Sequence, residues 1–243
     1  MEFTPSLIAI SCLVVLFAYF TRSLTGYASA LISIPLLALW LELDFVVPLV
    51  TLLEVVISLG LISSVRRDID RSILIPIIIG AFLGSLVGVF FLTAVDNAIL
   101  EKLLAVVIIV LAVNMLRTQK PPKSESPSTA GGLAAGIGGG ISGGVFGASG
   151  PVYVLYLAHR LREKSVLRAT LLALFAVDYG WRAIVYAANG LVTGDVLRFA
   201  LIVMPALLLG AVLGHYGQKR LDERQFSRVV ALVLILVGIL LYF

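Results

Sequence analysis

The chain has 243 residues, of which 60% are hydrophobic and only 13% charged, and its formal net charge is +4. Its mean hydropathy is +1.09. A soluble domain of this length cannot remove so much apolar surface from water, so the composition excludes a soluble globular protein and indicates a helical membrane protein with several spans. The positive charge does not indicate a nucleic-acid partner, because most of the basic residues lie in loops between apolar runs.

Several apolar runs are long enough to cross the hydrocarbon core of a bilayer, which takes about 20 helical residues. In chain order we expect spans at 45–65, 72–95, 98–116, 169–191, 196–216 and 226–243. The N-terminal segment has neither a basic start nor a small-residue cleavage site, so we expect it to be a retained first span and not a removed signal.

Two glycine-containing segments predict a helix, a break and a second helix. The first hairpin is expected at 6–22 and 26–41, and the second at 130–144 and 151–159. The piece 151–159 is too short to span a bilayer. Gly147 and Gly150 allow backbone conformations closed to other residues, and Pro151 suits the first turn of a helix. Ser149, Gly150 and Pro151 therefore predict a break followed by a new helix.

The glycines of the run 131–140 leave two interpretations open. Their small-xxx-small spacing is typical of close helix packing in membranes. Close packing does not explain the following "GASGP", so the helix break predicted there needs a separate explanation.

The sequence repeats itself. "GAFLGSLVG" at 80–88 corresponds to "GAVLGHYG" at 210–217, and each is followed by an aspartate and then a base. Those pairs are Asp96 with Lys102 and Asp222 with Arg228. We expect one repeat at 1–117, a cytoplasmic linker at 118–129 and a second repeat at 130–243.

The loops predict the orientation of these repeats. Lysine and arginine cluster at 66–71, 117–123, 160–168 and 219–228, and short basic loops remain cytoplasmic. Placing all four inside puts Asp96 outside and Asp222 inside, with the C-terminus external. The expected fold is thus all-α, a transmembrane bundle of two inverted repeats, each with a broken or re-entrant hairpin and three long spans. Inverted repeats are the architecture of many secondary transporters.

The two breaks are the predicted substrate site. A helix start offers unpaired N–H groups and the positive end of the helix dipole, which suit an anion. Irregular backbone at membrane depth is tolerated only where it is buried or lines a cavity. We expect the two starts to meet near the bilayer midplane. The predicted substrate-binding residues are Arg22, Thr25, Gly26, Ser29, Ser149, Gly150, Pro151 and Arg182.

Four ionisable residues lie well inside apolar runs: Arg22, Glu54, Asp178 and Arg182. Charges there are expensive and indicate function. Asp178 and Arg182 are four residues apart, so they can pair with each other or serve transport. Glu54 has no base within one turn, and burial favours its neutral form, so Glu54 and Asp178 are predicted proton carriers. Arg22 can pair with Glu54, bind substrate or reach the inner membrane face.

Nothing in the sequence indicates an enzyme, a cofactor or a metal site. The glycines lack the Lys–Ser/Thr of a nucleotide-binding loop, and both histidines lie at span ends. Cys12 cannot form an internal disulfide, since it is the one cysteine in the chain. The expected partners are a small anion and the lipid bilayer, without nucleic acid, and a homodimer is left open.

"TGYASALISIPLLAL" at 25–39 and "GGISGGVFGASGPVYVLYL" at 139–157 resemble the paired signatures of the TauE/SafE family of sulfite and organosulfonate exporters. This resemblance implies transport of small sulfur-containing anions, usually outward, across the cell membrane. The residue patterns alone indicate only an anion transporter. An uncoupled anion channel and a membrane subunit without transport remain the alternatives.

Overall fold

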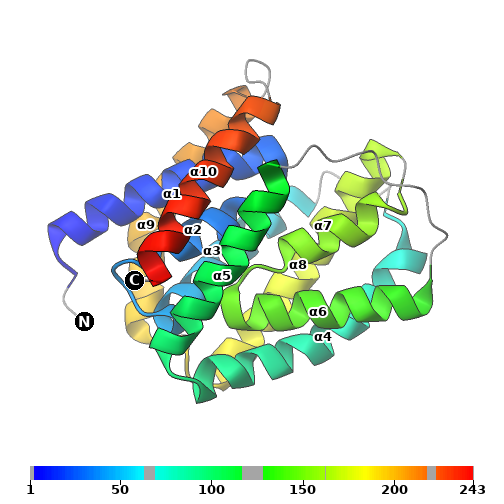
Figure 1. The fold of residues 1–243 in the computed structure, drawn as a ribbon, viewed down its shortest axis with the longest axis horizontal. Helices are drawn as coiled ribbons and strands as arrows, with labels where there is room; N and C mark the ends of the chain where they lie inside the picture. The colour runs from blue at the N-terminus through cyan, green and yellow to red at the C-terminus, as the bar shows by residue number, and fades with distance from the viewer. Residues whose placement is uncertain (1–2, 63–68, 117–127, 162, 218–222, 243) are drawn as a thin grey trace. The chain divides into compact units, whose positions relative to one another are not determined.

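The computed structural model describes residues 3–62, 69–116, 128–161, 163–217 and 223–242, and all regular structure within them is helical (Figure 1). The helices are α1 (Pro5–Thr25), α2 (Ser29–Leu37), α3 (Leu43–Ile62), α4 (Arg71–Ala94), α5 (Asn97–Leu116), α6 (Thr129–Phe146), α7 (Gly150–Ala158), α8 (Lys164–Ala188), α9 (Gly194–Gly217) and α10 (Glu223–Tyr242). The all-α prediction is confirmed.

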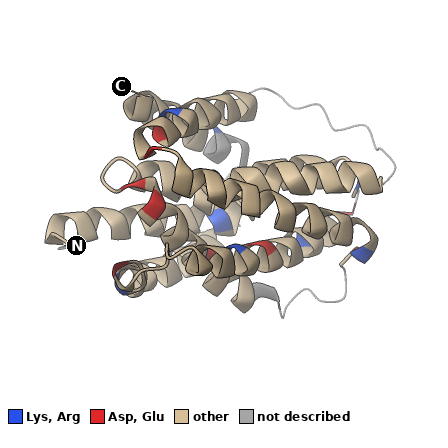
Figure 2. Ribbon diagram, turned by 90° about the horizontal axis from the view of Figure 1, so that it is seen from below, with Lys and Arg blue, Asp and Glu red and all other residues tan. Residues whose placement is uncertain are grey.

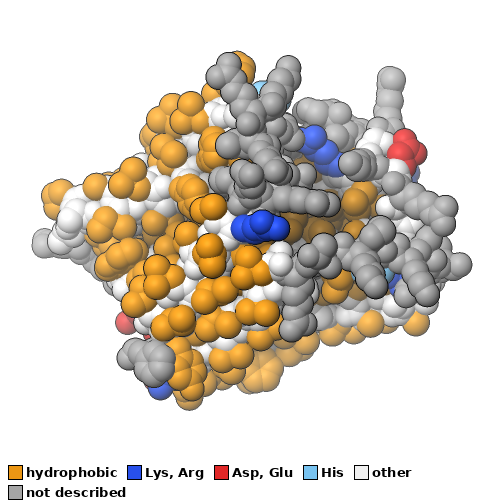
Figure 3. All heavy atoms as spheres, turned by 45° about the horizontal axis from the view of Figure 1, so that its top comes forward, with side chains coloured by type: hydrophobic (Ala, Val, Ile, Leu, Met, Phe, Trp, Pro, Cys, Tyr) orange, Lys and Arg blue, Asp and Glu red, His pale blue; other side chains and the backbone are white. Residues whose placement is uncertain are grey.

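Six of these helices, α1, α3, α4, α5, α8 and α9, are long and apolar enough to cross a membrane, and Arg228–Tyr242 of α10 is a shorter apolar helix. Charged residues are sparse along them (Figure 2). Their outward side chains are largely hydrophobic, with Leu201 72% and Phe90 64% exposed (Figure 3). These surfaces suit lipid, which confirms a multi-pass membrane protein. The expected span ends at 65 and 243, the basic cluster 117–123 and Asp222 lie outside the described residues.

Both predicted broken hairpins are present. α2 and α7 have nine residues each, about 14 Å of helix, which is half of the roughly 30 Å hydrocarbon core. Gly26 (φ 90°) ends α1 and Gly147 (φ 64°) ends α6, both in the left-handed conformation that favours glycine.

The first break lies later in the chain than expected. Arg22 and Thr25 belong to the last turn of α1 and not to the break, because the N–H of Gly26 still bonds to the carbonyl of Arg22 at 2.6 Å. The hydroxyl of Thr25 also bonds back to the carbonyl of Thr21 at 3.0 Å, as in a continuing helix. The second helix then begins at Ser29.

The chain forms two compact units. Unit 1 comprises Met1–Val50, Val95–Thr118 and Val192–Phe243, and unit 2 comprises Thr51–Ala94 and Gln119–Leu191. In unit 1, α1 packs along α9 and α5 along α10. In unit 2, α4 packs along α6 and contacts α8. Each unit thus combines a hairpin from one half of the sequence with the glycine-containing helix of the other half. The inverted relation of the repeats stays a prediction.

Glycines make the close contact between α4 and α6. A β-carbon at Gly136 would collide with the carbonyl oxygen of Ile77, and one at Gly140 would lie 2.5 Å from that of Ala81. Gly80 of α4 meets the backbone of α6 in the same way. The packing interpretation of the glycine run is therefore confirmed at Gly136 and Gly140. In unit 1, Gly210 of α9 lies against the backbone of Leu16 in α1.

Three segments that are far apart in the chain meet inside unit 1. The ring of Phe3 lies 6.0 Å from that of Phe45 and 4.6 Å from that of Phe199. These contacts join the N-terminus, the start of α3 and the start of α9.

Candidate functional site

The break between α6 and α7 is buried, and a backbone hydrogen bond closes the helix before it. The N–H of Gly147 bonds to the carbonyl of Gly143 at 2.8 Å and closes α6. Ser149 is the N-cap of α7, Gly150 is its first residue, and Pro151 lies in the first turn. The predicted helix start is therefore present. The left-handed backbone lies at Gly147 and not at Gly150, so the second glycine is not required by its φ angle.

One face of α8 points at this break. Asp178, Arg182 and Tyr186 follow one another at four-residue intervals and are at most 1% exposed. Arg182 forms an ion pair with Asp178 at 3.1 Å, so the pairing that the sequence left open is present. The hydroxyl of Ser149 donates a hydrogen bond to Oδ2 of Asp178 at 2.9 Å. Nη2 of Arg182 lies 3.5 Å from the same hydroxyl.

The end of α6 is held by the same helix. Nη1 of Arg182 donates to the carbonyl oxygen of Gly143 at 2.5 Å. The hydroxyl of Tyr186 lies 3.1 Å from that oxygen and 2.9 Å from the carbonyl oxygen of Gly144. A β-carbon at Gly143 would lie 2.9 Å from Nη1 of Arg182 and 3.0 Å from Cβ of Ser149. The missing side chain therefore gives the guanidinium access to the break.

The charge of Arg182 is compensated locally. Besides Asp178 and the Gly143 carbonyl, the guanidinium lies over the ring of Tyr179, 4.6 Å from its centroid. Three buried polar atoms around it make no hydrogen bond of good geometry in the described structure: Oδ1 of Asp178, Nε of Arg182 and the hydroxyl of Tyr153. The Tyr153 hydroxyl nevertheless lies close enough to Asp178 to interact with it electrostatically. Tyr153 therefore belongs to the same cluster as Asp178 and Arg182.

Trp181 fixes the rotation of α8 about its axis. Its indole N–H donates to Oγ of Ser85 on α4 at 3.0 Å, and its ring stacks on Phe82 with centroids 4.6 Å apart. Since Trp181 neighbours Arg182 in the chain, this anchor keeps the guanidinium directed at the break.

In unit 1, the first hairpin carries a second arginine–serine contact. Arg22 is 4% exposed, and its Nη1 donates to Oγ of Ser29 at 3.2 Å. The hydroxyl of Thr25 accepts the N–H of Ala28 at 3.3 Å. The structure therefore brings Arg22, Thr25, Gly26 and Ser29 together around the first break.

Glu54 is fully buried in the part of α3 that belongs to unit 2. Its predicted pairing with Arg22 joins the two units and stays a prediction. The same holds for the meeting of the two breaks near the membrane midplane. Within the described residues, no group of three or more His, Cys, Asp or Glu side chains could hold a metal ion.

Three members of the cluster in unit 2 were not found from the sequence: Tyr153, Tyr186 and the carbonyl of Gly143. Tyr186 continues the four-residue spacing of Asp178 and Arg182, so that periodicity could have identified it. Tyr153 lies one turn after Ser149 in the same helix. A backbone carbonyl leaves no signal in the residue types.

The fold and the buried ionic cluster define a class: a multi-pass helical membrane protein with broken helices, of the kind that transporters use. The chain belongs to the sulfite exporter TauE/SafE family, whose family model matches residues 11–241. It is therefore a membrane transporter and not an enzyme. No curated protein and no solved structure matches the chain.

Proposed function

We propose that the protein exports small sulfur-containing anions, such as sulfite or a sulfonate, as a proton-coupled secondary transporter of the cell membrane. The family supports the substrate class and the outward direction. The buried contact of Ser149 and Arg182 with Asp178 at the start of α7 is the observation that supports the site.

The start of α7 combines three features that attract an oxyanion. The first turn of a helix carries unpaired N–H groups and the positive end of its dipole. The hydroxyl of Ser149 and the guanidinium of Arg182 add two donors, which meet on one oxygen of Asp178 at 2.9 and 3.1 Å. An oxygen of sulfite or of a sulfonate has the same acceptor character, so we expect it to compete with Asp178 for these donors.

This competition supplies a reason for proton coupling. When the anion accepts the hydrogen bonds of Ser149 and Arg182, Asp178 loses both of these partners inside a buried cluster. A buried charge without a partner is strongly destabilising, so Asp178 takes up a proton as the anion binds. One proton then accompanies each monovalent anion, and each turnover moves no net charge.

Glu54 is the second proposed proton-coupling residue and passes on the same proton, since it is a fully buried acid of the same unit. Arg22, Thr25, Gly26 and Ser29 form the proposed counterpart of the site in the first hairpin. Gly150 and Pro151 contribute the helix start itself.

Efflux from proteoliposomes tests the proposal. Vesicles loaded with sulfite, thiosulfate, sulfoacetate or taurine are given a pH gradient at clamped potential, and separately a potential at equal pH. The proposed mechanism responds to the pH gradient with each of these substrates, and with a monovalent anion such as hydrogensulfite it does not respond to the potential. Asp178→Asn should bind the anion but lose the response to pH.

Ser149→Ala should weaken anion affinity about tenfold, because a hydrogen bond to a charged group is lost. Ser165→Ala is the matched control, since its hydroxyl is exposed and bonds to Glu163 at the start of α8. Flux that follows the potential and ignores pH would instead identify an uncoupled channel. Absence of flux and of any thermal shift with all four anions would indicate a subunit without transport.

A further inference from the structure

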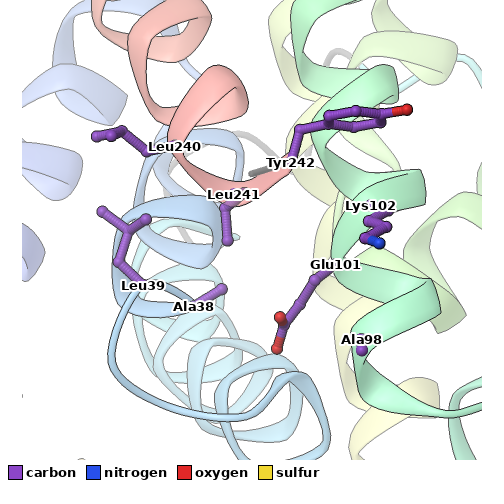
Figure 4. A pocket seen from close by; sticks show the side chains of 8 residues that line it. All are labelled: Ala38, Leu39, Ala98, Glu101, Lys102, Leu240, Leu241 and Tyr242. Carbon is purple, nitrogen blue, oxygen red and sulfur yellow. The ribbon is translucent and has the colours of Figure 1, made fainter.

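A cavity of about 310 Å³ lies within unit 1, where the end of α2, the start of α5 and the end of α10 come together (Figure 4). Ala38, Leu39, Leu240 and Leu241 form its apolar wall. Glu101 and Lys102 of α5 add one negative and one positive side chain. The cavity is separate from the cluster around Arg182, which belongs to unit 2.

The lining of the cavity points to the depth of lipid headgroups. This lining includes the start of α5, which is long enough to span a membrane, and the ends of membrane-spanning helices reach the polar layer of a bilayer. Trp40, 50% exposed, follows α2, and Tyr242, 48% exposed, lines the cavity. Exposed tryptophan and tyrosine are enriched at this level of the membrane. An occupant of this cavity therefore has both polar headgroup and hydrocarbon around it.

The charges select the kind of occupant. Glu101 is partly buried and its carboxylate points into the space between α5 and the segment after α2 (Figure 4). Glu42 and Asp96 lie near enough to add to its negative field. Lys102, the next residue, is exposed and positive. The cavity is thus complementary to a molecule that carries a cation and an anion a few bonds apart, next to an apolar chain.

We propose that this cavity binds the headgroup of a phosphatidylethanolamine-type membrane lipid. Its ammonium group donates to the carboxylate of Glu101, its phosphate contacts the ammonium of Lys102, and its first acyl carbons lie on Leu240 and Leu241. An ethanolamine ammonium has three N–H donors, whereas a choline headgroup has none. Charge-assisted hydrogen bonds are the stronger ones, so Glu101 discriminates between the two headgroups.

The test measures lipid binding to the purified full-length protein by native mass spectrometry, with a headgroup series of ethanolamine, N-methyl-, N,N-dimethylethanolamine and choline. Affinity should fall stepwise along the series, by about tenfold in total. Glu101→Gln should remove the differences in affinity between the four headgroups. Leu201→Ala, on a lipid-facing side of α9, is the control that should keep them. A stepwise preference that survives Glu101→Gln overturns the proposal.

Lys102 gives a second readout that does not depend on the Glu101 variant. Lys102→Glu should weaken binding of the ethanolamine lipid about tenfold, since it puts a negative charge beside the phosphate. Its exposed position makes the substitution compatible with folding. Unchanged affinity in Lys102→Glu, or equal wild-type affinity for a phosphatidylglycerol lipid, also overturns the proposal.

Discussion

The hydroxyl of Tyr186 bridges the last turn of α6, 3.1 Å from the carbonyl oxygen of Gly143 and 2.9 Å from that of Gly144. Arg182, one turn earlier on α8, bonds to the first of these oxygens. Two side chains of α8 thus hold the end of α6 in place, and the position of the guanidinium at the break depends on that contact.

Tyr186→Phe should therefore destabilise the protein while leaving every charge in place. Loss of one donor to buried carbonyls costs about 1–3 kcal/mol of unfolding free energy. Chemical denaturation in detergent measures it, with Tyr216→Phe as control because Tyr216 is 75% exposed. Equal stability of the two variants would contradict a capping role for Tyr186.

Gly136 and Gly138 of α6 form a matched pair that tests the packing of α4 on α6. A β-carbon at Gly136 would collide with the backbone of α4, whereas at Gly138 the nearest atom is Cγ1 of Val152, 4.0 Å away. Gly136→Ala should cost about 1–3 kcal/mol through overpacking. Gly138→Ala should be neutral or stabilising by up to about 1 kcal/mol, because alanine favours a helix. Thermal unfolding measures the stability of both variants. If Gly138→Ala were the less stable one, the register of α6 against α4 would be wrong.

Gly150→Leu should act on binding more than on stability. Gly150 is buried at the first position of α7, where the proposed anion meets the backbone. A leucine side chain there excludes the anion, and loss of one charge-assisted bond lowers affinity roughly tenfold to a hundredfold. Sulfite titration of the purified, monodisperse protein measures this effect.

Gly136→Leu serves as the packing control for that titration. It should unfold more easily and keep normal affinity in the surviving folded fraction. Loss of binding in Gly136→Leu together with retained binding in Gly150→Leu would place the anion elsewhere in the hairpin.

Glu54→Gln should abolish the dependence of flux on a pH gradient and leave anion binding measurable. The amide has nearly the shape of the carboxylic acid but cannot release a proton. Proteoliposome flux at two opposite pH gradients provides the measurement. A variant with unchanged coupling would assign Glu54 a structural role and leave Asp178 as the proposed proton carrier.

Cysteine labelling tests the predicted topology. In a Cys12→Ala background, an impermeant reagent added outside should modify Val192→Cys, in the acidic turn before α9. Glu163→Cys, just before α8, should be modified only after the membrane is permeabilised. The opposite labelling pattern would contradict the loop orientation from which the inverted repeats were predicted.

Composition and glycine pattern were enough to predict the helices. Apolar runs of sufficient length have one structural solution in a bilayer, and Gly147 with Pro151 indicated where a helix stops and the next begins. The boundary at Arg22 was misplaced, because the chain remains helical until Gly26.

The site could be predicted only where the residue types carry the chemistry. Asp178 and Arg182 were identified because charged residues are costly in apolar segments, and Ser149 because it stands at the predicted helix start. The contact of Ser149 with Asp178 was not predicted, since the two residues lie on different helices and their distance depends on how α7 meets α8. The carbonyls of Gly143 and Gly144 could not be identified from the sequence, because only the folded position of Tyr186 marks them as hydrogen-bond acceptors.

The exchange of helices between the two halves of the sequence has a consequence for biosynthesis. α4 meets its partner α6 soon after it leaves the ribosome, because one helix separates them in the chain. α1 can be covered only after α9 has been synthesised, because Gly210 of α9 lies against the backbone of Leu16 in α1. A nascent chain that ends at Leu191 would contain every helix of unit 2. Its first helix, α1, would still lack its packing partner α9.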